Sequence, residues 1–294
     1  MPLVYGLVVG DAVVLYLVSI VAHADFDWWL VALGAVAVAG FALRLPEWLV
    51  RWAPMVLIGV LFLALGGLSQ RQGAHALSTF PIDVDRALSG VVVPVWLQQH
   101  AGVLLGGVPA AALVAEYMLH YAAPLLTALW LWRRHRARFD GFVAAYFLAM
   151  VTGFAVYLAV PQAAPWFAAE HGLLPPLHRS IVDVMQSIHV GSLYAALDPE
   201  PFGAMPSLHV TIPVVVAATL VRVQRSAWRW LWVLYPVTVA FGVLVMAEHY
   251  VVDTVAGAVV GLLAVALVRA LPERWLSGHQ TNGTNRRVVR EYST

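Results

Sequence analysis

Long apolar stretches dominate this chain and restrict what it can fold into. A membrane-spanning helix needs about 20 consecutive, mostly apolar residues. Eight stretches of this kind lie near residues 3–22, 28–43, 49–68, 109–132, 140–160, 206–224, 229–247 and 250–270. Overall, 61% of the residues are hydrophobic and 11% are charged, against about a quarter charged in soluble domains. The sequence therefore predicts an all-α, polytopic integral membrane helical bundle with about eight transmembrane helices, because barrel strands would instead alternate over short segments.

The basic residues, which are all arginine, fall almost entirely on one side of the predicted spans. Of the 17 arginines, only Arg71, Arg86 and Arg179 lie on the other side. Because cytoplasmic loops carry an excess of basic residues, we expect both termini to be cytoplasmic. The loops 69–108 and 161–205 are then extracytoplasmic. The arginine-only, alanine- and valine-rich composition indicates a prokaryotic plasma membrane protein.

Two short polar segments stand at the outer ends of predicted spans. The first, "FGAMPSLHV" (202–210), contains Ser207 and His209, and the second, "EHYVVD" (248–253), contains His249 and Asp253. The topology places both histidines at one membrane depth, and Asp253 follows His249 at the i+4 spacing of one helix face. We expect Asp253 to accept a hydrogen bond from Nδ1–H of His249, which leaves Nε2 as a nucleophile. A carboxylate inside a span is costly unless it has a partner and a function.

The start of the 206–224 span adds a place for an anion. Backbone N–H groups at a helix N-terminus favour a bound phosphate, Ser207 can cap the helix or donate to the anion, and Gly203 allows close backbone approach. Together these residues indicate phosphoryl transfer through a phosphohistidine. Two other interpretations remain open. Two histidines and an aspartate could bind a metal, and intramembrane His and Asp also occur in transporters and proton relays.

These segments resemble the type 2 phosphatidic acid phosphatase superfamily, whose hallmark is Pro-Ser-Gly-His followed by His-x-x-x-Asp. More narrowly, Pro206 to His209 and His249 to Asp253 are similar to the inositol phosphorylceramide synthase and sphingolipid synthase branch, in which the segments read Pro-Ser-Leu-His and His-Tyr-x-x-Asp. Weaker similarity extends over about residues 80–270. The resemblance implies that His249 attacks phosphorus with support from Asp253. His209 would protonate the leaving group and then deprotonate the acceptor, without a metal or cofactor.

The chain departs from the superfamily pattern where phosphate is bound. The early Lys…Arg-Pro element is absent, and Gly242 and Val243 stand where a Ser-Arg pair is expected. The transferase branch shares these absences, so another arginine must meet the phosphate charge. We expect Arg179 first and Arg86 second, although either could be a solvated loop charge.

A further polar cluster lies in the outer half of the 109–132 span and contains Glu116, Tyr117, His120 and Tyr121. Glu116 and His120 are four residues apart and are predicted to share one face. The cluster could form a wall of the headgroup pocket, or it could supply hydrogen bonds that join helices. We favour the pocket wall, because two ionisable groups on one intramembrane face are costly.

The sequence thus predicts a membrane phosphotransferase with its active site at the outer leaflet. It would move an inositol phosphate-like headgroup between a phospholipid, or another lipid phosphate, and the hydroxyl of a small polyol or lipid. Residues 1–70 would be N-terminal transmembrane helices, 71–275 the phosphatidic acid phosphatase-like catalytic domain, and 276–294 a disordered cytoplasmic tail. The alternatives are a phosphatase for lipid phosphates or isoprenoid pyrophosphates, and a transporter or proton relay. Nothing in the sequence suggests a nucleic acid partner.

Overall fold

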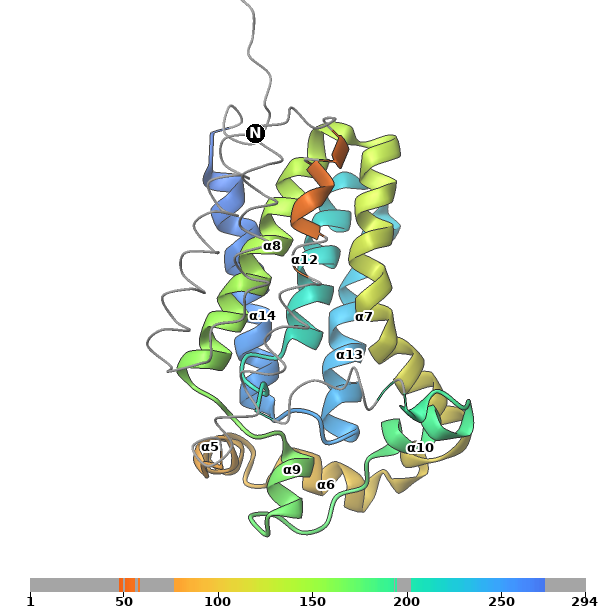
Figure 1. Cartoon of the computed structure of the whole chain (residues 1–294), viewed down its shortest axis with the longest axis vertical. Helices are drawn as coiled ribbons and strands as arrows, with labels where there is room; N and C mark the ends of the chain where they lie inside the picture. Colours follow the sequence, from red (N-terminus) through yellow and green to blue (C-terminus); the bar gives the residue numbers. More distant parts are fainter. Residues whose placement is uncertain are drawn as a thin grey trace, which may run out of the picture.

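The computed structural model describes residues 48–49, 51–55, 58, 77–192, 194 and 202–272. Upright helices form the body of this part, and short helices close its lower end in Figure 1. The upright set consists of α7 (Gly107–Arg134), α8 (Arg136–Ala159), α12 (Leu208–Val223), the 3-10 helix η3 (Ala227–Val233), α13 (Leu234–Val245) and α14 (Val251–Ala270). The lower set consists of α5 (Phe80–Ser89), α6 (Val93–His100), η2 (Gly102–Leu105), α9 (Pro165–Glu170) and α10 (Ser180–Ser187).

The later predicted spans correspond to these upright helices. Four helical segments are long and apolar enough to cross a membrane: Gly107–Arg134, Arg136–Ala159, Ala227–Val245 and Val251–Ala270. The span predicted at 206–224 is the apolar helix α12, which is shorter at 16 residues. The first two predicted spans, and most of the third, lie outside the described residues. The described part is therefore a helical membrane protein, and the number of spans in the whole chain stays a prediction.

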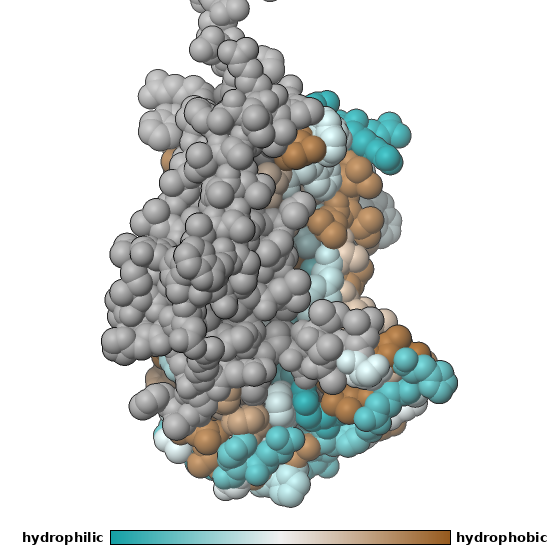
Figure 2. Space-filling model, viewed as in Figure 1, coloured by the Kyte–Doolittle hydropathy of each residue, from teal (hydrophilic) through white to brown (hydrophobic). Residues whose placement is uncertain are grey.

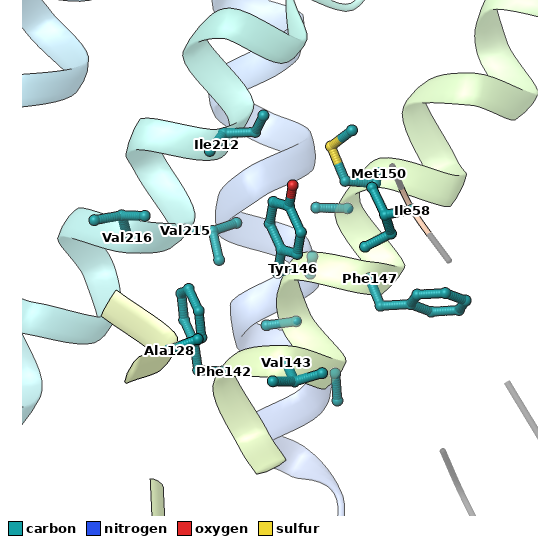
Figure 3. Close-up of a cluster of buried hydrophobic side chains, with 14 of the residues drawn as sticks. Ile58, Ala128, Phe142, Val143, Tyr146, Phe147, Met150, Ile212, Val215 and Val216 are labelled. Carbon is teal, nitrogen blue, oxygen red and sulfur yellow. The ribbon is translucent and has the colours of Figure 1, made fainter. Parts of the chain in front are cut away.

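Helix α8 lies at the centre of the main hydrophobic core. After Asp140 its side chains are almost all apolar, as expected for a helix surrounded by other helices. Figure 3 shows Phe142, Tyr146 and Met150 of α8 beside Ile212 and Val215 of α12. This packing holds α12, which carries one of the two candidate histidines, against the rest of the bundle.

Two glycines one turn apart let α14 approach α12 closely. A Cβ atom at Gly257 would lie 2.3 Å from the Ser207 carbonyl oxygen, and one at Gly261 would lie 2.9 Å from the Thr211 carbonyl oxygen. The hydroxyl oxygen of Thr211 lies 2.9 Å from the carbonyl oxygens of both Ser207 and Gly257. Small residues four apart commonly allow such contacts between membrane helices. The pair sets the distance between the helices that carry the two polar segments.

A buried carboxylate on α5 ties the lower helices to the start of α14. The side chain of Asp85 accepts hydrogen bonds from the backbone N–H of Val93, at 3.2 Å, and of Val251, at 3.0 Å. A carboxylate is favourable at a helix N-terminus. Burial nevertheless raises the pKa of Asp85 to about 6, because the charged form is desolvated. Asp85 thus holds the segment that follows His249 in place from outside the bundle.

Candidate active site

His249 lies in a tight turn between α13 and α14. The backbone N–H groups of Glu248 and His249 both point at the Val243 carbonyl, at 2.9 and 3.3 Å. Ala247 has a positive φ of 60°, which is uncommon and unfavourable for a residue with a Cβ. The Ala247 carbonyl accepts a hydrogen bond from the backbone N–H of Trp166 at 3.1 Å. The turn presents His249 toward α12, and its side chain is almost completely buried.

The two histidines form a direct hydrogen bond, with His209 Nδ1 3.0 Å from His249 Nε2. His249 Nδ1 lies 2.9 Å from the Ala204 carbonyl oxygen. Because a carbonyl can only accept, His249 Nδ1 must carry the proton, and neutral His249 then has its lone pair on Nε2. The proton in the bond between the histidines therefore belongs to His209 Nδ1. The predicted nucleophilic nitrogen and the predicted acid are adjacent, with a proton between them.

Asp253 does not hold His249 as the sequence predicted. Its Oδ2 lies 3.7 Å from His249 Nδ1, beyond a normal hydrogen bond, while it accepts the Tyr250 backbone N–H at 2.8 Å. His249 precedes α14, and Asp253 is the third residue of that helix, where a carboxylate caps the free N–H groups. The Ala204 carbonyl thus fixes the tautomer, and Asp253 supplies a buried negative charge nearby.

Ser207 occupies the N-cap position of α12, but its side chain forms no capping hydrogen bond. Its hydroxyl is buried and has no hydrogen-bond partner among the described residues. Its backbone N–H instead donates to the Asp253 carbonyl at 2.9 Å. Of the two roles expected for Ser207, its position is the N-cap, but the side chain does not make the capping hydrogen bond. The loop before Ser207 is fixed by backbone contacts with Gln162. Gly203 forms an isolated β-bridge with Gln162, and the Ala204 N–H donates to the Gln162 carbonyl at 3.0 Å.

The polar cluster of α7 divides between two surfaces. Tyr117 stacks on His209 with a ring distance of 4.2 Å, and His120 meets the same ring edge-on at 4.4 Å. Tyr121 packs against His120 at 3.8 Å. Glu116, in contrast, accepts a hydrogen bond from the Thr238 hydroxyl of α13. Glu116 therefore fits the helix-joining interpretation, whereas Tyr117 and His120 contact the His209 ring and Tyr121 supports His120.

Arg179 lies beside the turn that carries His249. Its guanidinium is 3.7 Å from a Glu248 carboxylate oxygen and stacks 3.5 Å above the Trp166 ring. Trp166 also donates its indole N–H to the other Glu248 oxygen at 3.1 Å. Arg86 is different, because its side chain is 58% exposed and lies 3.9 Å from Asp83 on the surface of α5. Of the two predicted phosphate ligands, only Arg179 contacts Glu248, the residue before His249.

A cavity of about 290 Å³ opens beside the two histidines. Its polar part contains His209, His249, Glu248 and His120. Apolar and aromatic side chains form the remaining wall, which includes Met55, Leu125, Tyr146, Met150 and Tyr157. Four predicted substrate-binding residues are not among its lining residues: Arg86, Glu116, Arg179 and Ser207. Sequence reasoning did not find Tyr146, Tyr157 or the Ala204 carbonyl, since neither an apolar helix face nor a backbone oxygen leaves a specific signal.

Within the described ranges, no three His, Cys, Asp or Glu side chains are arranged to hold a metal ion. Both nitrogens of His249 are already directed at protein groups, namely the Ala204 carbonyl and His209. The arrangement can transfer a proton between the histidines and can offer a lone pair to an electrophile in a partly apolar cavity.

Comparison with known families identifies the class of protein. The family model described as the PAP2 superfamily matches residues 82–267, which is more than half of the chain. No curated protein and no solved structure gave a match. The chain belongs to the PAP2 superfamily, and this membership indicates a membrane phosphatase or phosphotransferase for lipid-like phosphates. The matched region includes both polar segments and every helix from α6 to α13.

Proposed function

We propose that this protein is a membrane phosphotransferase that moves a phospho-headgroup between a lipid and a hydroxyl acceptor through a phosphohistidine on His249. The observation that carries the proposal is the hydrogen bond between His209 and His249, combined with the Ala204 carbonyl that fixes the tautomer. A nucleophile oriented by one group and paired with an acid is the arrangement that covalent catalysis requires. The resemblance to inositol phosphorylceramide synthases makes an inositol phosphate-like headgroup the first choice.

In the first half-reaction, the phosphorus atom enters between the two imidazoles. His249 Nε2 forms a bond to phosphorus, and the bond from phosphorus to the leaving oxygen breaks. His209, protonated on both ring nitrogens, gives its Nδ1 proton to that oxygen and becomes neutral. In-line attack requires the leaving oxygen on the His209 side. The two nitrogens, now 3.0 Å apart, must then separate to roughly 6–7 Å. This distance has to hold both the near-attack contact from His249 to phosphorus and the hydrogen bond from the leaving oxygen to His209. The resting hydrogen bond is therefore broken by the substrate.

In the second half-reaction, an acceptor hydroxyl gives its proton to His209 Nδ1, and its oxygen attacks the phosphohistidine. The bond between His249 and phosphorus breaks, and both histidines return to their starting states. Tyr117 and His120 hold the His209 ring on two sides, which favours one orientation for both proton transfers. Asp253, with its buried carboxylate 3.7 Å away, stabilises the positive charge that His249 gains during attack.

Phosphate charge is met by Arg179 and by the N-terminus of α12. The Arg179 guanidinium already pairs with the Glu248 carboxylate and stacks on Trp166. A phosphate that binds Arg179 would therefore replace Glu248 as its anionic partner. Guanidinium groups bind phosphate oxygens in a bidentate manner. The buried hydroxyl of Ser207, two residues before His209, is available as an additional donor.

A hydroxyl acceptor suits the cavity better than water alone. The wall away from the histidines consists largely of apolar and aromatic side chains from α7, α8 and α12. Such a surface binds the apolar part of a lipid acceptor or donor and excludes water from the intermediate. The arginine distribution supports an active site at the outer leaflet, by the positive-inside rule.

The deciding experiment uses purified protein in detergent with phosphatidylinositol, an isoprenoid phosphate and a lipid alcohol, followed by mass spectrometry. We expect headgroup transfer to the alcohol that survives EDTA, is lost in His249→Ala and persists in the control His100→Ala on α6. A quenched reaction should contain protein with a mass increase on His249. Free phosphate as the sole product would make the enzyme a phosphatase. Full activity in His249→Ala, or loss with EDTA, would overturn the phosphohistidine mechanism.

A further inference from the structure

A second cavity lies at the end of the bundle opposite the histidines. It has a volume of about 590 Å³ and sits between the turn from α7 to α8 and the connection from α12 to η3. In Figure 1 these connections are at the upper end, away from α5, α6, α9 and α10. Its polar lining consists of His135, Arg138, Arg222, Gln224, Arg225 and Ser226. No part of the proposed catalytic mechanism uses this cavity.

The lining offers positive charge and hydrogen-bond donors without a carboxylate. Arg222 experiences repulsion from Arg138 and from Arg269 of α14. The nearest acid along the chain, Asp140, is paired with Arg51 at 3.2 Å. Within the described residues, no salt bridge joins a lining arginine to a carboxylate. Arg138 and Arg222, which repel each other, lie with Arg225 around one cavity, and an anion bound among them would relieve this repulsion.

The two neutral lining side chains are also oriented as donors. The Gln224 side-chain oxygen accepts the Trp232 indole N–H at 3.0 Å, which leaves the Gln224 amide N–H groups to donate. The Ser226 hydroxyl oxygen accepts the Trp228 backbone N–H at 3.3 Å, and its own hydrogen stays available. Every polar lining group therefore has a donor to offer, since even neutral His135 keeps one ring N–H.

The tryptophans of η3 place this cavity at the level of lipid headgroups. Trp228 is 74% exposed and Trp230 is 60% exposed, and Arg229 lies over the Trp230 ring at 5.3 Å. Exposed tryptophans and arginines gather at the membrane–water interface. Figure 2 shows hydrophilic side chains at this upper end and hydrophobic ones below it. A phosphate in the adjacent leaflet would lie at the depth of the cavity.

We propose that this cavity binds the headgroup of an anionic phospholipid from the leaflet opposite the active site. The volume exceeds the needs of a single phosphate ion and falls in the range of small-molecule sites. The guanidinium groups of the lining arginines can bind the phosphodiester in a bidentate manner. Gln224 and Ser226 would donate hydrogen bonds to the rest of the headgroup. Because the site joins the α7–α8 turn to the α12–η3 connection, its occupation stabilises the folded bundle by mass action.

The test measures lipid binding to the detergent-purified full chain by native mass spectrometry. The probes are dioctanoyl phosphatidylglycerol, dioctanoyl phosphatidylcholine and inorganic phosphate, each titrated separately. The variant is the double substitution Arg222→Gln/Arg225→Gln. The matched control is Arg133→Gln/Arg134→Gln, which removes the same charge from the same end of the bundle but outside the lining. Binding in the active-site cavity is common to all variants and adds the same background.

We expect the cavity variant to weaken phosphatidylglycerol binding by about tenfold or more, as two charge-assisted contacts are lost, and the control to change it less than twofold. Equal losses in both would mean general attraction to a basic surface and would overturn the site. Phosphatidylcholine binding as strong as phosphatidylglycerol binding would overturn the preference for an anionic headgroup, and inorganic phosphate of equal affinity would overturn the lipid as ligand. If the double variant does not fold, Ser226→Asp replaces it. This substitution keeps an acceptor for the Trp228 N–H and puts a negative charge in the cavity, so unchanged binding would refute the proposal.

Discussion

Replacing Gly257 by alanine tests whether the close approach of α14 and α12 sets the geometry of the histidine pair. The added Cβ would lie 2.3 Å from the Ser207 carbonyl oxygen, which is about 1.1 Å closer than the 3.4 Å at which ordinary contacts begin. The Ser207 carbonyl is backbone and already accepts from the Thr211 hydroxyl at 2.9 Å, so it cannot rotate away. The helices must therefore shift by about 1 Å.

Two opposite effects act on stability. Alanine is the better helix former by up to about 1 kcal/mol, whereas overpacking costs about 1–3 kcal/mol. We expect a net loss of about 1–2 kcal/mol in the free energy of unfolding. Activity should fall more steeply, because Ser207 is two residues from His209, and a misplacement of about 1 Å can cost about 100-fold in rate.

The assays are the unfolding midpoint in detergent and the rate of headgroup transfer or phosphate release. Gly141→Ala is the matched control, because a Cβ at Gly141 of α8 meets nothing within 4 Å. It should leave activity unchanged and raise the midpoint slightly. Gly261→Ala, with a closest contact of 2.9 Å, should be intermediate. Wild-type activity and stability in Gly257→Ala would refute the view that this contact fixes the site.

Two further perturbations address the lower end of the bundle. Because burial raises the pKa of Asp85 from 3.8 to about 6, the folded protein binds this proton more tightly than the unfolded chain, and the associated stability is full below about pH 4 and lost as the pH rises through about 6. Asp85→Asn should remove this pH dependence of the free energy of unfolding, a change of at most about 3 kcal/mol. The control Asp83→Asn, on the exposed face, should keep it. Parallel pH profiles of wild type and Asp85→Asn would contradict this role of Asp85. Arg179→Gln should raise KM for the phosphate substrate by about tenfold or more and change kcat less, and a larger KM effect from Arg86→Gln, measured in parallel, would reverse the order of the two candidates.

Hydropathy alone predicted the upright helices between residues 107 and 270, because the bilayer requires long apolar segments whatever their partners. The boundaries were close, as at Val251–Ala270 for the span predicted at 250–270. The short helices at the lower end were harder to predict. The buried role of Asp85 depends on a contact with Val251, 166 residues away. No local pattern indicates such a contact.

The site was partly predictable for a related reason. The sequence predicted that His209 and His249 lie close together, because both stand at the outer ends of apolar segments and so at the same membrane depth. Side-chain direction could not be obtained in this way. Asp253 follows His249 by one helical turn, but α14 starts after His249, so the spacing rule did not apply. Gly257 and Gly261 were visible as a small-residue pair, which a search for helix contacts could have found.

The resting bond between the histidines has a consequence for substrate choice on the proposed mechanism. While His209 donates to His249 Nε2, the attacking lone pair is occupied, and Arg179 is likewise occupied by Glu248. A substrate must break the histidine bond, worth about 1 kcal/mol net, and displace a carboxylate before reaction. A small soluble phosphate ester has little binding energy outside the reacting group, whereas a lipid has an apolar part that fits the wall formed by Leu125, Met150 and Tyr157. Remote binding energy can be used to reorganise a reacting centre, so the closed polar end and the apolar wall together favour lipid phosphates over soluble ones.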